Sequence, residues 1–111
     1  MITIDSLKDY GANVEEGLAR CLNKEDFYLK MVNLGLADER FEKLSDILAS
    51  KDFDAAFEAV HVLKGVIGNL ALTPLYEPID KMTELLRART DTDYSSLCAQ
   101  IKEQRDKILA M

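Results

Sequence analysis

Apolar residues recur every three or four positions along most of this 111-residue chain. The most regular run consists of Phe53, Ala56, Val60, Leu63, Ile67 and Leu70. Because an α-helix has 3.6 residues per turn, this spacing brings the six side chains onto one face and predicts an amphipathic helix over residues 53–70. A half-buried strand would alternate apolar and polar residues, and the sequence has neither that alternation nor an Asn-Gly or Asp-Gly hairpin turn. The chain is therefore expected to be all-α.

A second run predicts one long helix from residue 24 to residue 50. Its apolar positions also step by three or four: Phe27, Met31, Leu34, Ala37, Phe41, Leu44 and Leu48. Asn23 is a suitable N-cap for this helix. Gly35 offers a place where the helix could bend midway.

Two further runs follow the 53–70 segment. The third stripe is Leu75, Ile79, Met82 and Leu86. Its helix can begin after Pro74 or only at Pro78, because a proline inside a helix removes a hydrogen bond and kinks it. Residues 89–93, RTDTD, form the clearest turn, and a weaker fourth stripe comes after it: Tyr94, Leu97, Ile101 and Ile108.

The runs define the expected architecture. Upstream of the long helices, NVEEGLARCL predicts a short helix with a capping box from Asn13 to Glu16. Four amphipathic helices joined by short loops favour an antiparallel four-helix bundle over residues 24–110. One or two short N-terminal helices are expected within residues 3–22. Residues 1–111 are thus expected to form a single domain.

Composition narrows the classes of function. The net charge of −6 argues against nucleic-acid binding, which requires a basic face. No apolar window approaches the length of a membrane span, and the N-terminus lacks a basic lead, so a cytoplasmic, soluble monomer is expected. Cys21 and Cys98 are expected to be free thiols in a reducing compartment. One histidine and two scattered cysteines provide no metal-ligand spacing, so no metal or haem is expected.

The single histidine, His61, lies inside the 53–70 helix. At about 100° per residue, the apolar stripe lies about 220° from His61 on the helical wheel, whereas Lys64, Gly65 and Gly68 fall on the histidine's own face. The imidazole is therefore expected to point into solvent. A buried core histidine and an idle surface histidine remain as alternatives.

The two glycines beside His61 need an explanation. Each glycine inside a helix costs about 0.8–1 kcal/mol relative to alanine. Gly65 and Gly68 clear side chains from the surface next to the imidazole, which would let a bulky partner approach. Close packing of another helix against the glycines is the alternative.

The neighbours of His61 indicate the chemistry. Imidazole titrates near neutral pH, so an exposed one offers a free ring nitrogen as a nucleophile. Lys64, three residues on, can bring an ammonium to a phosphoryl group on that nitrogen. Phe57 and Val62 flank the histidine and would anchor a partner, unless Phe57 packs on a neighbouring helix. The sequence has no glycine-rich phosphate loop, so autokinase activity is not expected.

The motif HVLKG, residues 61–65, followed by Leu70, resembles the histidine-containing phosphotransfer (HPt) domains of bacterial phosphorelays. EEGLARCLNKEDFYLKMV, residues 15–32, is similar to the N-terminal segment of that family, so the resemblance covers nearly the whole chain. It implies that His61 accepts the phosphoryl group, Lys64 stabilises it and Gly65 keeps the approach open. Two departures are Val66 and Ile67, where small residues are common, and Ala71, where glycine is usual.

The resemblance also implies partners. The chain would exchange its phosphoryl group with the aspartate of a response-regulator receiver domain, which supplies the Mg²⁺, and a hybrid histidine kinase would stand upstream. The chain would need no cofactor of its own. Two alternatives stay open: an adaptor that binds a signalling protein through the His61 face without phosphoryl chemistry, and a bundle that encloses a ligand, although the core stripes contain no polar cluster.

Overall fold

The computed structural model describes all 111 residues, and its regular structure consists of seven α-helices. In chain order they are α1 (Ile4–Tyr10), α2 (Val14–Arg20), α3 (Glu25–Leu36), α4 (Arg40–Ala49), α5 (Phe53–Asn69), α6 (Thr73–Arg87) and α7 (Ser95–Leu109). The all-α prediction is confirmed, and α1 and α2 are the expected short N-terminal helices. None of the helices combines the length and the apolar character that crossing a membrane requires.

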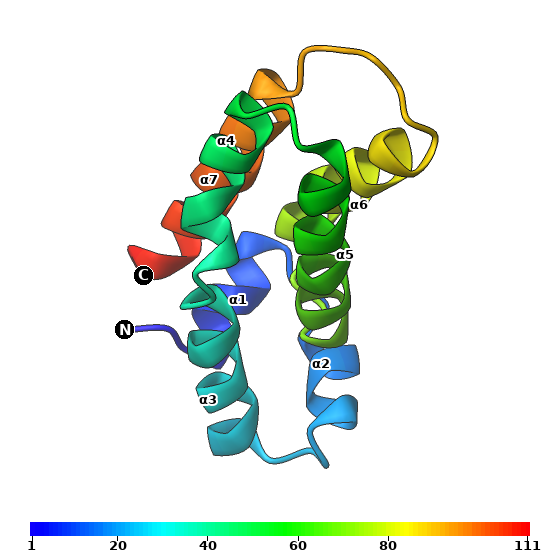
Figure 1. Cartoon of the computed structure of the whole chain (residues 1–111). Coiled ribbons are helices and arrows are strands. Elements are labelled where there is room, and N and C mark those ends of the chain that lie inside the picture. Colours follow the sequence, from blue (N-terminus) through cyan, green and yellow to red (C-terminus); the bar gives the residue numbers. More distant parts are fainter.

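Helices α4 to α7 form the antiparallel four-helix bundle. α5 packs against α4 on one side and α6 on the other, and α7 closes the ring by contacting both α6 and α4. Figure 1 shows α2 and α3 at the opposite end of the molecule from the loop that joins α6 to α7, with α1 near the middle. The molecule is elongated, measuring 41 × 24 × 20 Å.

The predicted single helix over residues 24–50 is wrong, because it is broken into α3 and α4. The Asp38 carboxylate accepts a hydrogen bond from the backbone N–H of Arg40, 2.9 Å away, where α4 begins. On the other side of the break, Arg105 of α7 donates to the carbonyl of Leu36, 2.7 Å away. Gly35, the expected bend, is helical and buried, and Leu70 lies so close that an added Cβ would meet its Cδ1 at 2.8 Å.

The buried face of α3 also differs from the prediction by one position. Tyr28, Val32 and Leu36 are buried, whereas Phe27 and Leu34 are 43% and 57% exposed. Tyr28 can be buried because its hydroxyl donates to the Leu70 carbonyl at 2.8 Å, which satisfies its polar end. Since α3 and α4 are separate helices, their buried faces need not follow one continuous stripe.

The predicted core face of α5 is confirmed except at its first residue. The buried members are Ala56, Val60, Leu63, Ile67 and Leu70. The Asp52 side chain accepts from the N–H of Ala55 at 3.1 Å and caps the helix. Phe53 is 37% exposed and lies against Tyr94, with ring centroids 6.0 Å apart.

Helix α6 begins at Thr73, so of the two possible starts the earlier one is correct. Pro74 occupies the first turn, where a missing N–H leaves no helical bond unmade. Pro78 lies within the helix and is buried. All four predicted core positions of α6 are buried: Leu75, Ile79, Met82 and Leu86. The predicted turn at 89–93 falls in the loop before α7.

The remaining local predictions concern the N-terminal half and the cysteines. The Asn13 side chain accepts from the N–H of Glu16 at 3.2 Å and caps α2 as predicted. The predicted Asn23 cap is wrong, because Lys24 is the N-cap of α3 and no side chain caps that helix. Cys21 is buried, Cys98 is half-buried, and both are free thiols.

Candidate functional site

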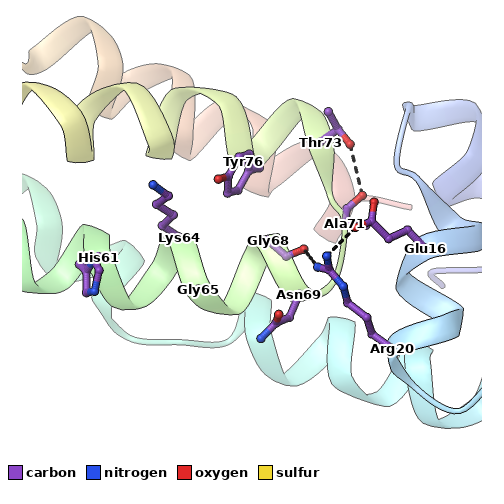
Figure 2. Close-up of a pocket in the computed structure, with 10 residues that line it drawn as sticks. All are labelled: Glu16, Arg20, His61, Lys64, Gly65, Gly68, Asn69, Ala71, Thr73 and Tyr76. Atoms are coloured by element: carbon purple, nitrogen blue, oxygen red, sulfur yellow. Dashed lines mark hydrogen bonds and ion pairs between the residues drawn. The ribbon is translucent and has the colours of Figure 1, made fainter.

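His61 lies near the middle of α5 and is exposed, on the face opposite the buried Val60 and Leu63. The prediction that the imidazole faces solvent is therefore confirmed, and the core-histidine alternative is excluded. Figure 2 shows it on the same helix as Lys64, Gly65 and Gly68. The histidine is positioned by α5 itself, because burial of the apolar stripe fixes which way the opposite face points.

Phe57, one turn before His61, stacks on the imidazole. The two ring centroids are 5.5 Å apart and the planes differ by 22°. The guanidinium of Arg87, from α6, lies 5.2 Å from the centroid of the Phe57 ring. Phe57 is consequently half-buried and held between the histidine and the neighbouring helix, while Val62 is 38% exposed. The alternative in which Phe57 packs on a neighbouring helix is thus correct in part, because Phe57 contacts Arg87 of α6 but also stacks on His61.

The Lys64 ammonium is engaged by α6. Its Nζ lies 2.9 Å from Oδ1 of Asp80 and 3.4 Å from Oε1 of Glu84. The hydrogen bond to Asp80 is the main cause that raises the pKa of Lys64 above its ordinary value. In Figure 2 the lysine side chain extends from α5 toward α6 rather than toward His61. These carboxylates would therefore compete for the ammonium with any anionic group on the imidazole.

The two glycines of this face have different surroundings. A Cβ at Gly65 would meet no atom within 4 Å, so this part of the helix surface is open as predicted. A Cβ at Gly68 would lie 3.2 Å from Cε2 of Tyr76, and the Gly68 carbonyl accepts a hydrogen bond from Arg20 at 2.7 Å. The alternative explanation, that a glycine lets another helix pack closely, thus applies to Gly68.

A hollow of about 510 Å³ adjoins His61 between α2, α5 and α6. Its walls are Glu16, Arg20, His61, Lys64, Gly65, Gly68, Asn69, Ala71, Thr73 and Tyr76. Figure 2 shows His61 at one end of this hollow and Arg20 at the other, where Glu16 holds the guanidinium at 2.5 Å. The hollow thus has the imidazole at its edge and two cationic side chains in its walls, each of which is paired with a carboxylate.

Two more hollows border the same face. One, of about 430 Å³, lies on the α4 side of the histidine and includes His61, Phe57, Val62, Arg40 and Ile47 among its lining residues. The other, of about 650 Å³, is largely apolar and runs between α3 and α5, with Phe27, Met31, Leu34, Val66 and Leu70 in its walls. Arg20 and Asn69 line both this groove and the 510 Å³ hollow, so the two are neighbours.

Sequence reasoning missed the α2 and α6 side chains of the site. The spacing of Glu16 and Arg20 indicates only an ion pair within one helix. Asp80 and Glu84 are likewise one turn apart, but their contact with Lys64 depends on how α6 is placed against α5. No group of three or more histidine, cysteine, aspartate or glutamate side chains is arranged to hold a metal ion.

Comparison with known proteins identifies the family of the bundle. Residues 34–110 match the Hpt domain, a stretch that contains α4 to α7 and with them His61, Lys64 and both glycines of the site. Residues 1–33 lie outside this match, and no curated protein and no solved structure matches the chain. Since the match covers more than half of the sequence, the chain belongs to the Hpt domain family, whose members carry phosphoryl groups in phosphorelay signalling.

Proposed function

We propose that this protein carries a phosphoryl group on His61 and exchanges it with the aspartate of a response-regulator receiver domain. The observation that supports this most directly is the position of the chain's one histidine. It is exposed on α5 of an Hpt bundle, beside a glycine whose surroundings are open. A receiver could therefore bring its aspartate to the imidazole without displacing a side chain at position 65.

The transfer itself needs few groups from this chain. A lone pair on a ring nitrogen of His61 attacks the phosphorus of the aspartyl phosphate. As the N–P bond forms, the P–O bond to the aspartate breaks and its electron pair leaves on the carboxylate. The proton on the other ring nitrogen stays there or is released to water, and the reverse reaction retraces these steps. Phosphoryl transfer depends mainly on positioning and charge neutralisation, so the Mg²⁺ expected on the receiver can complete the site.

The chain's own residues would position and stabilise the group. Phe57 orients the imidazole by stacking on it, and Arg87 restrains Phe57 from the other helix. Lys64 would stabilise the charge of the phosphoryl group once its ammonium turns from α6 toward the histidine. We assign Gly65 and Val62 to the surface that the receiver covers, with Phe57 at its border. Gly68 would contribute by allowing the close approach of Tyr76 and α6.

An adaptor function is the second candidate, and a specific observation favours it. The apolar groove between α3 and α5 could bind a protein partner, and Lys64 is held by two carboxylates rather than free beside the histidine. An adaptor would bind receivers or kinases without taking up phosphate.

The two candidates are separated by transfer from phosphorylated receivers. A panel of receiver domains, labelled on aspartate by a kinase and radioactive ATP, is mixed with the wild-type chain and with the His61→Gln variant. The carrier function predicts acid-labile, alkali-stable label on the wild type and none on the variant, whose circular dichroism melt should be unchanged within a few degrees. Receivers that bind the wild type but never label it would favour the adaptor. Label on the variant would place the acceptor elsewhere.

A further inference from the structure

The contacts of Lys64 join the candidate site to two acidic residues of α6. Asp80 and Glu84 are four residues apart, one helical turn, and both carboxylates reach the same ammonium at 2.9 and 3.4 Å. The Lys64 side chain is 27% exposed, which makes it less accessible than either of its partners, at 40% and 53%. The α6 helix therefore holds the one cationic side chain that lies a single turn from His61 on α5.

A second path of contacts connects the same α6 face to the imidazole. Arg87 lies 3.5 Å from the Glu84 carboxylate through its Nε, and its guanidinium covers Phe57, which in turn stacks on His61. Glu84 is thus shared between Lys64 and Arg87. Lys64 and Phe57, which lie one turn on either side of His61 along α5, are thus both contacted by side chains of α6.

Phosphorylation of His61 would place the phosphoryl group in competition with two carboxylates for Lys64. Without the phosphoryl group, two carboxylates neutralise the ammonium. With it, the doubly charged phosphoryl group one turn away also attracts the ammonium, and each contact that the lysine makes with it competes with those to Asp80 and Glu84. The stabilisation that Lys64 gives to phosphohistidine is therefore reduced by the contacts that it loses.

Resting on the proposed function, we infer that Asp80 and Glu84 are positioning residues that hold Lys64 away from His61 and thereby lower the share of phosphoryl groups that this chain retains against its receiver. The pair keeps the phosphohistidine reactive, so that the chain passes its group on rather than storing it. The contacts lie at the surface, where an ion pair changes an equilibrium by a small factor. The expected size of the effect is accordingly about two- to five-fold.

The test compares matched variants. Asp80→Asn with Glu84→Gln removes both carboxylate charges and keeps the shape of the side chains. Glu103→Gln with Asp106→Asn, on the exposed surface of α7, makes the same change of net charge away from the site. Each protein is equilibrated with a phosphorylated receiver, and the ratio of phospho-His61 to phospho-receiver is measured. The α6 variant should raise that ratio about two- to five-fold, and the α7 variant should leave it unchanged.

The Lys64→Ala variant shows whether the two carboxylates act by holding the lysine or by repelling the phosphoryl group directly. If the acids act by occupying Lys64, their neutralisation should change the ratio much less once the lysine is gone. An equally large change in the Lys64→Ala background would show that the carboxylates repel the phosphoryl group directly, and would overturn the inference.

An NMR titration of the Lys64 side chain tests the contact without any transfer. The pKa of Lys64 should lie above its ordinary value in the wild type and fall toward it in the α6 variant. A wild-type pKa at the ordinary value would overturn the inference. A wild type that accepts no phosphoryl group would overturn the proposed function and this inference with it. A wild type labelled on His61, with an unchanged ratio in the α6 variant, would overturn the inference alone.

Discussion

Replacing Gly65 should change stability and transfer in opposite directions. A Cβ at this position meets no atom within 4 Å, and Gly65 is not among the residues of positive φ, so Gly65→Ala introduces no strain. The gain is then the helix propensity of alanine over glycine, about 0.8–1 kcal/mol. For a domain of this size the unfolding entropy converts that gain into a rise of about 4 °C in Tm.

Two other glycines provide controls of known surroundings. At Gly68 a Cβ would lie 3.2 Å from the Tyr76 ring, so the same gain is offset by displacement of that ring, and Gly68→Ala should stabilise less than Gly65→Ala. At Gly17 a Cβ would lie 2.6 Å from Cε1 of Tyr28 and 2.9 Å from the Leu70 carbonyl oxygen. Gly17→Ala should therefore lower stability by about 1–3 kcal/mol, as overpacking does elsewhere.

The Gly65→Gln variant tests the part of the prediction that concerns phosphotransfer. Glutamine is a good helix former, so the variant should melt at or above the wild-type temperature. Its side chain would occupy the surface that the receiver needs, and a displacement of about 1 Å lowers the transfer rate about 100-fold. Tm and phosphotransfer rate are measured on the same preparations. A Gly65→Gln variant that melts several degrees lower would mean that Gly65 is a packing position, and one that is stable and transfers normally would refute the open-approach reasoning.

Three further predictions concern the charge at the site and the packing of the N-terminal half. Lys64→Ala should slow transfer yet leave a measurable rate, because the lysine stabilises charge and forms no bond. A rate equal to that of the wild type at low salt would show that Lys64 takes no part in the transfer. Burial raises the pKa of the Tyr28 hydroxyl from 10.0 to about 12, so the unfolded chain loses that proton first and wild-type stability should fall as pH rises through this window. Tyr28→Phe should weaken that alkaline loss while lowering stability at neutral pH by about 1 kcal/mol, because the Leu70 carbonyl loses its donor. A difference in unfolding free energy between wild type and variant that is the same at pH 9 and pH 11 would contradict this. Arg105→Met should lower the free energy of unfolding by about 1.5–3 kcal/mol through the lost hydrogen bond to Leu36, and an unchanged denaturant midpoint would show that the α3–α4 break does not depend on Arg105.

The register of α5 could be predicted because its apolar residues include one unbroken stripe at steps of three and four, although Phe57, Val62 and Val66 lie outside that stripe. The segment FYLKMVNLGL of α3 is apolar on more than one face, so spacing alone could not choose between Phe27 and Tyr28. The choice depends on the Leu70 carbonyl, which accepts the Tyr28 hydroxyl from another part of the chain. The break after α3 is likewise stabilised by Arg105, far away in sequence, and such contacts leave no local signal.

In the candidate site too, features that depend on one helix could be predicted from the sequence, whereas contacts between helices could not. A helical wheel correctly places His61 opposite the core, since that follows from α5 alone. It puts Gly65 and Gly68 on one face but cannot distinguish them, because the difference is made by Tyr76 of α6. The engagement of Lys64 by α6 could not be predicted for the same reason, since spacing within a helix does not define its register against a neighbour.

Mass spectrometry can establish whether His61 is the residue that carries the phosphoryl group. The wild type and His61→Gln are incubated with a phosphorylated receiver, digested under alkaline conditions that preserve an N–P bond, and sequenced by fragmentation. We expect a phosphoryl group on the peptide that contains His61 in the wild type and no phosphorylated peptide in a folded His61→Gln variant. A phosphoryl group on any other residue of the wild type, or on the variant, would contradict it.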